Sequence, residues 1–291
     1  MSAATALLLV AAAIAAEPVP KDASKAASEK SEKKAPPPAG LASGGWKFEE
    51  LRRFPVPEAG QGVVVDGDFF YALNNYTVAK YRKATGERVA LWDGGKGGPV
   101  IHINAGIVHA DRLYCAHSNY PGVPMLSSVE IFDTATLQHV GSYSLGRTDG
   151  SLTWIDRREG KWIACFVHYG KKGGEPGKGP EWTHLVEYDD NWQRLRGWAR
   201  PADLVAHAGV KGYSLSGGAF GPGGKLFATG HDDPELYVLD FPTAGSVLKW
   251  IATVPIAAEG QSFGWDAKEN GMFYSIGRKK REVIVGRVTG P

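Results

Sequence analysis

Three histidines occupy matching places in the chain, each directly after a short apolar run. His117 follows the run LYCA, His168 follows WIACFV, and His231 follows LFATG. Imidazoles that converge beside a carboxylate suit a divalent transition metal such as Mn or Zn, and Ca is a further candidate. Without a metal, one imidazole can act as a general base. The pattern therefore predicts a metal site with His117, His168 and His231 as ligands, or an acid–base site built from the same side chains.

Other polar side chains stand in equivalent places, before the first or after the second apolar run of a unit. The predicted catalytic residues are His168, His231, Glu259 and Arg278. The predicted ligand-binding residues are Asn74, His102, Tyr120, Tyr169 and Gln261. In this hypothesis the guanidinium of Arg278 binds an anionic group of the ligand. The alternative is that the histidines orient loops, or recur because one unit was duplicated.

The elements that would position these residues form an internal repeat. Segments that begin near Gln61, Asn104, Asp149, Gly217 and Glu259 each hold an apolar run, a Gly/Asp turn and a second apolar run. Most are followed by another such pair. Four strands that recur at about 40–50 residues are typical of β-propeller blades. In an antiparallel blade, the loops before the first and after the second strand share one end. The candidate residues are therefore expected around the mouth of a central channel.

The last repeat is one strand short. It ends after the run REVIVGRV, which supplies only a third strand. The segment from Lys47 to Val56 precedes the first full repeat and can supply the missing outer strand. Such pairing would close the ring and remove two open sheet edges. The sequence thus predicts an all-β, five-bladed propeller of four-stranded antiparallel blades, closed by its N-terminal strand.

The N-terminal region divides into three parts. Residues 1–16 contain a short apolar stretch that ends in small residues before a polar break, which indicates a cleaved signal peptide. Residues 17–45 are rich in Lys, Ala, Ser and Pro and predict a disordered linker. Residues 46–291 form the propeller domain. We therefore expect a periplasmic or secreted protein with no stable membrane insertion after cleavage; an uncleaved anchor is the alternative, since no Lys or Arg precedes the apolar stretch.

The composition limits the kinds of binding partner that we expect for this protein. The chain has 291 residues and a formal net charge of only +2, which argues against a nucleic-acid partner. Its two cysteines, Cys115 and Cys165, lie in apolar runs and are interpreted as buried, inert thiols, with a single disulfide as the alternative. We expect a monomer whose partner is a small molecule.

Two segments carry a resemblance to known propellers. The sequence GPGGKLF at 221–227 and the sequence ELYVL at 235–239 resemble repeats of the streptogramin-lyase-like, lactonase-like and gluconolactonase-like superfamily, some members of which are labelled cycloisomerases. The resemblance implies a His-lined axial site in an exported lyase, isomerase or lactone hydrolase that acts on a small anionic or polyhydroxylated substrate. The alternative function is a non-catalytic envelope propeller that binds a ligand or a protein.

Overall fold

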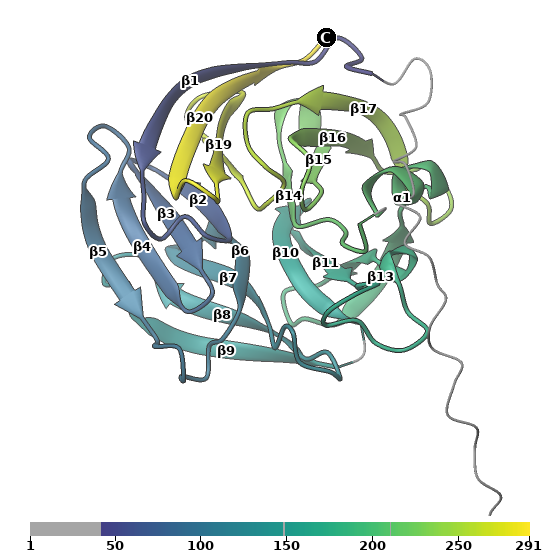
Figure 1. Cartoon of the computed structure of the whole chain (residues 1–291), viewed down its shortest axis with the longest axis horizontal. Helices are drawn as coiled ribbons and strands as arrows, with labels where there is room; N and C mark the ends of the chain where they lie inside the picture. The colour runs from purple at the N-terminus through teal and green to yellow at the C-terminus, as the bar shows by residue number, and fades with distance from the viewer. Residues whose placement is uncertain (1–41, 148, 210) are drawn as a thin grey trace, which may run out of the picture. The chain divides into compact units, whose positions relative to one another are not determined.

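The described residues form five blades around a common axis. The computed structural model describes residues 42–147, 149–209 and 211–291, so the predicted signal peptide and most of the predicted linker lie outside the described residues. Five four-stranded antiparallel sheets follow one another along the chain (Figure 1). Their innermost strands contact one another in order, and the last contacts the first. The predicted five-bladed propeller is therefore confirmed.

The blades have the following strands, from the axis outward. Blade 1 holds β2 (Gly62–Asp66), β3 (Phe69–Asn74), β4 (Thr77–Arg82) and β5 (Arg88–Asp93). Blade 2 holds β6 (Ile103–His109), β7 (Arg112–Ser118), β8 (Ser127–Asp133) and β9 (His139–Gly146). Blade 3 holds β10 (Ser151–Arg158), β11 (Lys161–Val167), β12 (His184–Tyr188) and β13 (Arg194–Ala199). Blade 4 holds β14 (Gly217–Phe220), β15 (Leu226–Thr229), β16 (Glu235–Asp240) and β17 (Lys249–Pro255). Blade 5 holds β18 (Gly264–Trp265), β19 (Met272–Gly277), β20 (Glu282–Thr289) and β1 (Lys47–Pro55).

Burial along the strands explains the apolar runs of the sequence. The second strands of blades 2 and 3, β7 and β11, are packed on both faces between neighbouring blades, so their sequences are nearly continuous apolar runs instead of alternating ones. Trp154 of β10 is fully buried in the core between blades 3 and 4. Gly218 of β14 leaves room for its indole, because a Cβ there would overlap the Trp154 ring. Close packing between blades thus fixes where the inner strands stand around the axis.

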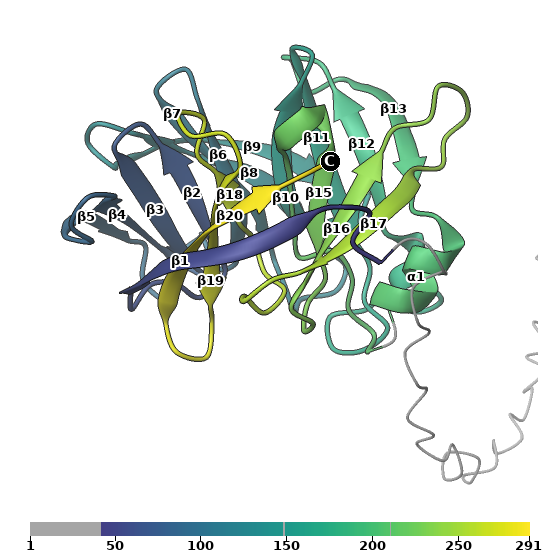
Figure 2. The ribbon, with the colours of Figure 1, turned by 90° about the horizontal axis from the view of Figure 1, so that it is seen from above.

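The N-terminal strand closes the ring as expected. β1 pairs antiparallel with β20 from Lys47 opposite Thr289 to Pro55 opposite Glu282, and the two strands lie side by side in both ribbon views (Figures 1 and 2). The backbone contacts begin earlier than Trp46, where we predict the domain to start. The carbonyl of Ala42 accepts a hydrogen bond of 2.7 Å from the N–H of Thr253.

Two insertions stand at the end of the propeller where the first strands of the blades begin. The β11–β12 connection contains a short 3-10 helix, η1 (Pro180–Trp182), and the β13–β14 connection contains α1 (Ala202–Ala208). A second 3-10 turn, η2 (Pro222–Gly224), joins β14 to β15 at the other end. No helix within the described ranges is long and apolar enough to cross a membrane.

Both cysteines are buried and free. Cys115 of β7 and Cys165 of β11 are fully buried in the cores between blades. Burial raises the pKa of the Cys165 thiol to about 12 and raises that of Cys115 as well. Both thiols therefore stay protonated near neutral pH, and the interpretation as buried inert thiols is confirmed.

The contribution of Asp156 to stability is expected to depend on pH. Burial raises the pKa of Asp156 to about 6, although its carboxylate accepts hydrogen bonds from the N–H groups of Arg157 and Phe220. A carboxyl with a raised folded-state pKa stabilises the fold fully below its unfolded value, near 4, and this stabilisation is lost as pH rises through about 6. The free energy of unfolding of the wild type and of Asp156→Asn is measured with urea at several pH values from about 4 to 7. Over this range the wild type should lose about 3 kcal/mol of stability relative to the variant. If the difference in unfolding free energy between the two proteins did not change with pH, the raised pKa of Asp156 would be wrong.

Candidate functional site

A small polar pocket lies on the axis, at the end where the inner strands begin. Its volume is about 210 Å³. Its lining comes from all five blades: Gln61, His102, Asn104, Tyr120, Thr153, Tyr169, Tyr213, Ser216, His231, Gln261 and Arg278. Six of the predicted site residues are in this set: His102, Tyr120, Tyr169, His231, Gln261 and Arg278. The structure therefore brings these six together from segments that are far apart along the chain.

Each blade contributes one uncharged polar side chain to the pocket from the start of its inner strand. These residues are Gln61, Asn104, Thr153, Ser216 and Gln261. Asn104 and Thr153 are the extra residues at irregularities in the pairing of the first and second strands, and such bulges turn a side chain away from the regular alternation. The amide of Asn104 donates to the carbonyl of Leu152 (2.8 Å), and the hydroxyl of Thr153 donates to the carbonyl of Leu215 (3.0 Å). These side chains therefore connect adjacent blades and present their remaining polar atoms at the axis.

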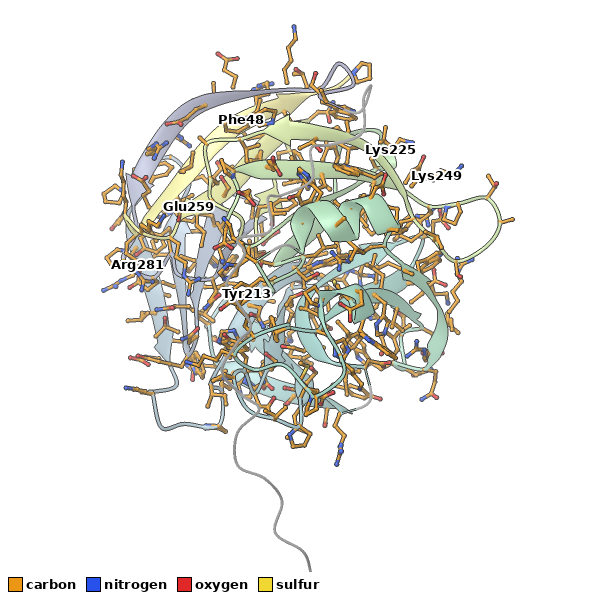
Figure 3. The ribbon with its side chains drawn as sticks, turned by 45° about the vertical axis from the view of Figure 1, so that its right-hand side comes forward. Phe48, Tyr213, Lys225, Lys249, Glu259 and Arg281 are labelled. Atoms are coloured by element: carbon orange, nitrogen blue, oxygen red, sulfur yellow. The ribbon has the colours of Figure 1, made fainter. Side chains whose placement is uncertain are left out.

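Five rings in contact form a continuous arc along one wall of the pocket. His102 lies 5.0 Å from Tyr120, Tyr120 lies 5.0 Å from Tyr169, and Tyr169 lies 6.1 Å from Tyr213, measured between ring centroids. The imidazole of His231 stacks on Tyr213 with centroids 4.2 Å apart and planes 17° apart. Figure 3 labels Tyr213 near the centre of the view. Mutual packing holds the imidazoles and hydroxyls of this arc in fixed positions.

His231 has the arrangement of a general base. Its Nδ1 lies 2.8 Å from a carboxylate oxygen of Asp232. A carboxylate only accepts hydrogen bonds, so Nδ1 carries the proton and the lone pair of the neutral ring is on Nε2. Within the described part of the chain, Nε2 has no hydrogen-bond partner. An oriented imidazole with a free lone pair at a pocket wall can remove a proton from a bound molecule.

The pocket has a positive rim and neutral walls. Burial, together with smaller effects of the nearby His117 and Arg278, lowers the pKa of His102 to about 4, so His102 is neutral at pH 7. The guanidinium of Arg278 is exposed and makes no hydrogen bond or ion pair with another described residue. No carboxylate is present among the described lining residues. The electrostatics therefore favour a ligand with a negatively charged group.

The structure does not bring the three predicted metal ligands together. Nε2 of His117 accepts a hydrogen bond from the N–H of Ile101 (3.0 Å), and its Nδ1 bonds the hydroxyl of Ser128 (2.8 Å). Nε2 of His168 lies 3.1 Å from the carbonyl of Asp149, and the ring is buried. Only His231 of the three lines the pocket, because the other two rings satisfy backbone groups of their own blades. Within the described ranges, no three His, Cys, Asp or Glu side chains are grouped so that they could hold a metal ion.

Two further predicted residues lie beside the pocket without lining it. Glu259 forms an ion pair of 2.7 Å with Lys279, and Asn74 packs beside Arg281 against Gly60, where a Cβ would overlap both side chains. Figure 3 labels Glu259 and Arg281 to the left of Tyr213. These positions fit roles in supporting the loops of the rim.

Several lining residues and Asp232 are absent from the predicted set. The lining residues are Gln61, Asn104, Thr153, Tyr213 and Ser216. Four of them occupy the stretch just before or at the start of an inner strand, the same kind of position as the predicted Gln261. Thr153 lies inside an apolar strand and reaches the axis only through a bulge, for which the sequence gives no sign. Asp232 has a signal in the sequence, because it directly follows the predicted His231.

Comparisons with known proteins identify the fold of the chain but not its function. No family model matches the chain, and no curated protein matches it. Glutaminyl cyclase from Myxococcus xanthus is similar in structure, with a TM-score of 0.55, 12% identity, and coverage of 84% of this chain and 97% of the cyclase. A luciferin-regenerating enzyme is similar with a TM-score of 0.52, 13% identity, and coverage of 84% of this chain and 96% of that enzyme. At such low identity these similarities show that the chain shares a β-propeller fold with both proteins.

Proposed function

We propose that this protein is an exported enzyme that binds a small anionic molecule in the axial pocket and removes a proton from it with His231. The observation that carries the proposal is the convergence of the Arg278 guanidinium and an Asp-oriented imidazole, His231, on one small pocket. Among the described residues, Arg278 has no ion-pair partner and no carboxylate lines the pocket. Arg278 would hold the anionic group of the substrate. Asp232 would stabilise the imidazolium that forms when Nε2 takes the proton.

The size and lining of the pocket limit the substrate. A volume of about 210 Å³ is smaller than the usual range for drug-sized ligands, about 300–1,000 Å³. It therefore suits a small acid, a sugar lactone or one end of a longer molecule. The hydroxyl and amide groups contributed by the five inner strands suit a polyhydroxylated substrate. A lyase or isomerase would use His231 on a C–H next to a carboxylate, and a lactone hydrolase would use it on a water molecule.

One observation favours the alternative, a non-catalytic propeller that binds a protein. Loops at the same end as the pocket carry four exposed apolar side chains. They are Ile101, Val123, Leu126 and Trp182, which are 39–53% exposed. Apolar side chains gathered on one face are typical of interaction sites. Retention of full activity after Trp182→Ala would separate the enzyme from this alternative, in which the same change weakens partner binding.

The proposal can be tested before the substrate is identified. A panel of sugar lactones, uronic and hydroxy acids is incubated with the purified protein, and products are followed by mass spectrometry and NMR. Peptides with an N-terminal glutamine join the panel because one similar structure is a glutaminyl cyclase. Solvent deuterium incorporated into the substrate reports proton removal directly, even where no net product forms. Binding without turnover or deuterium exchange across the panel would favour the non-catalytic alternative.

Substitution Arg278→Gln is expected to weaken binding of the anionic ligand by about 10- to 100-fold, since a hydrogen bond to a charged group contributes about 1.5–3 kcal/mol. It should also raise the pKa of His102 from about 4, because the positive charge of Arg278 helps to lower it. NMR titration of the His102 ring checks the second effect without any ligand. The matched control is Lys280→Gln, on the same β19–β20 hairpin and outside the pocket lining. An equal effect of both variants would contradict the role of Arg278.

A further inference from the structure

A second, larger cavity lies at the opposite end of the axis. Its volume is about 630 Å³, three times that of the polar pocket and within the range of small-molecule sites. The far ends of the five inner strands line it, whereas the polar pocket is lined at the near ends. The two cavities therefore differ in position, size and lining.

The walls of this second cavity combine polar groups with one apolar or aromatic side chain from each inner strand. They include Val65, Ile107, Ile155, Phe220 and Trp265, one from each inner strand. The indole of Trp265 presents its ring at this wall, while its N–H is buried and has no hydrogen-bond partner among the described residues. Apolar and aromatic side chains beside a small number of polar groups are typical of sites for organic molecules.

The charged groups at the wall leave one carboxylate unpaired. Asp266 forms an ion pair of 2.5 Å with Lys83, and Lys268 pairs with Asp68 at 2.8 Å. Both oxygens of Asp156 accept backbone N–H groups. Asp66 is partly buried and makes no hydrogen bond or ion pair with any described residue.

The cations nearest to Asp66 do not satisfy it. Lys80 and Lys268 act on its carboxylate through space. The ammonium of Lys80 donates to the carbonyl of Thr134 (2.7 Å) and lies over the ring of Phe69. The ammonium of Lys268 bonds Asp68. A partly buried carboxylate without a direct partner gains free energy from a bound cation.

We infer that this cavity is a second ligand site, which takes an organic cation: an ammonium group on an apolar or aromatic body. The ammonium binds the carboxylate of Asp66, and the body packs against Phe220 and Trp265 at the wall. A positively charged group beside an indole gains further from the electron density of the ring. The site is independent of the proposed chemistry, because it shares no lining residue with the polar pocket.

The test compares three probes of similar size on the wild-type protein by isothermal titration calorimetry and saturation-transfer NMR. They are phenethylammonium, the uncharged 3-phenylpropan-1-ol and the anion phenylacetate. We expect phenethylammonium to bind at least about tenfold more tightly than the alcohol, and phenylacetate to show no binding at this site. Equal binding of the ammonium and the alcohol, or no binding of the ammonium at millimolar concentration, would overturn the inference.

Single substitutions test whether phenethylammonium binds at Asp66. Asp66→Asn should weaken phenethylammonium binding about tenfold or more and leave the fold intact, since the carboxylate makes no contact that folding requires. The matched control is Glu87→Gln, an exposed carboxylate in the same blade that lies outside the cavity lining. Arg278→Gln, at the polar pocket, should leave this binding unchanged. Unchanged affinity in Asp66→Asn, or an equal loss in Glu87→Gln, would count against the site whatever the outcome at the polar pocket.

Discussion

Replacement of His231 by Gln is expected to slow turnover by about 10²- to 10⁴-fold, the usual contribution of a positioned general base. Glutamine retains the length and polarity of the side chain but has no lone pair of comparable basicity. The stack on Tyr213 and the hydrogen bond to Asp232 are local contacts, so the fold and ligand affinity should change little. The measurement is kcat for a substrate found in the panel, or the rate of solvent deuterium exchange where no product accumulates.

Substitution of Asp232, the carboxylate beside His231, provides a second test of proton removal by His231. Asp232→Asn replaces the acceptor at Nδ1 with an amide that can donate to it, which moves the ring proton to Nε2. The lone pair then points away from the pocket, so we expect a loss of turnover close to that of His231→Gln, with ligand affinity retained. The split between kcat and affinity separates an effect on chemistry from a general disturbance of the pocket.

The control for both variants is His109→Gln. His109 is an exposed histidine at the far end of β6, outside the pocket lining, and its loss should leave turnover unchanged. If His231→Gln retained wild-type turnover, the assignment of His231 as base would be wrong. If instead it abolished ligand binding along with turnover, the imidazole would be a binding group.

The largest expected effect on stability comes from Trp46→Ala. Trp46 stands just before the closing strand β1, is only 8% exposed, and meets Phe227 of blade 4 edge to face at 5.1 Å. Its indole therefore joins the N-terminal strand to a blade that is not its own sheet. Truncation of a buried aromatic side chain typically costs about 3–5 kcal/mol. We expect a loss of that size in the free energy of unfolding, measured by urea denaturation with circular dichroism.

An exposed tryptophan provides the comparison for this loss. Trp182 is 53% exposed, so Trp182→Ala should change the free energy of unfolding by no more than about 0.5 kcal/mol. A cost below about 1 kcal/mol for Trp46→Ala would mean that the contact with Phe227 contributes little to closure of the ring. Such a result would assign the closure to the pairing of β1 with β20 and to other side chains of β1, such as Phe48 against Phe273.

The number of blades and the way the ring closes could both be predicted from the sequence. Paired apolar runs recur with turn signals between them, and this periodicity sets the four strands of each blade. The last repeat lacks a strand, and the segment from Lys47 is the available strand that could fill the gap. It does so as β1, because an open edge on β20 would leave its backbone groups unpaired.

The site was predictable in part for the same reason. Repeats of fixed strand order put equivalent loops at one end, so His102, Tyr120 and His231 were expected near the axis, and they line the pocket. The prediction did not hold for His117 and His168, although each follows its apolar run in the same way. Both rings hydrogen-bond backbone groups of the loops before β6 and β10, and neither lines the pocket.

The sequence by itself thus determined the strand pattern, the repeat and the end of the ring where polar side chains gather. Only the tertiary structure decided which of them face one another. Bulges at Asn104 and Thr153 aim those side chains between blades. The partners of each imidazole come from neighbouring backbone that the sequence pattern does not specify, as with Ile101 and His117. Periodicity fixes the place of a residue along a strand, whereas the direction of its side chain depends on contacts made across blades.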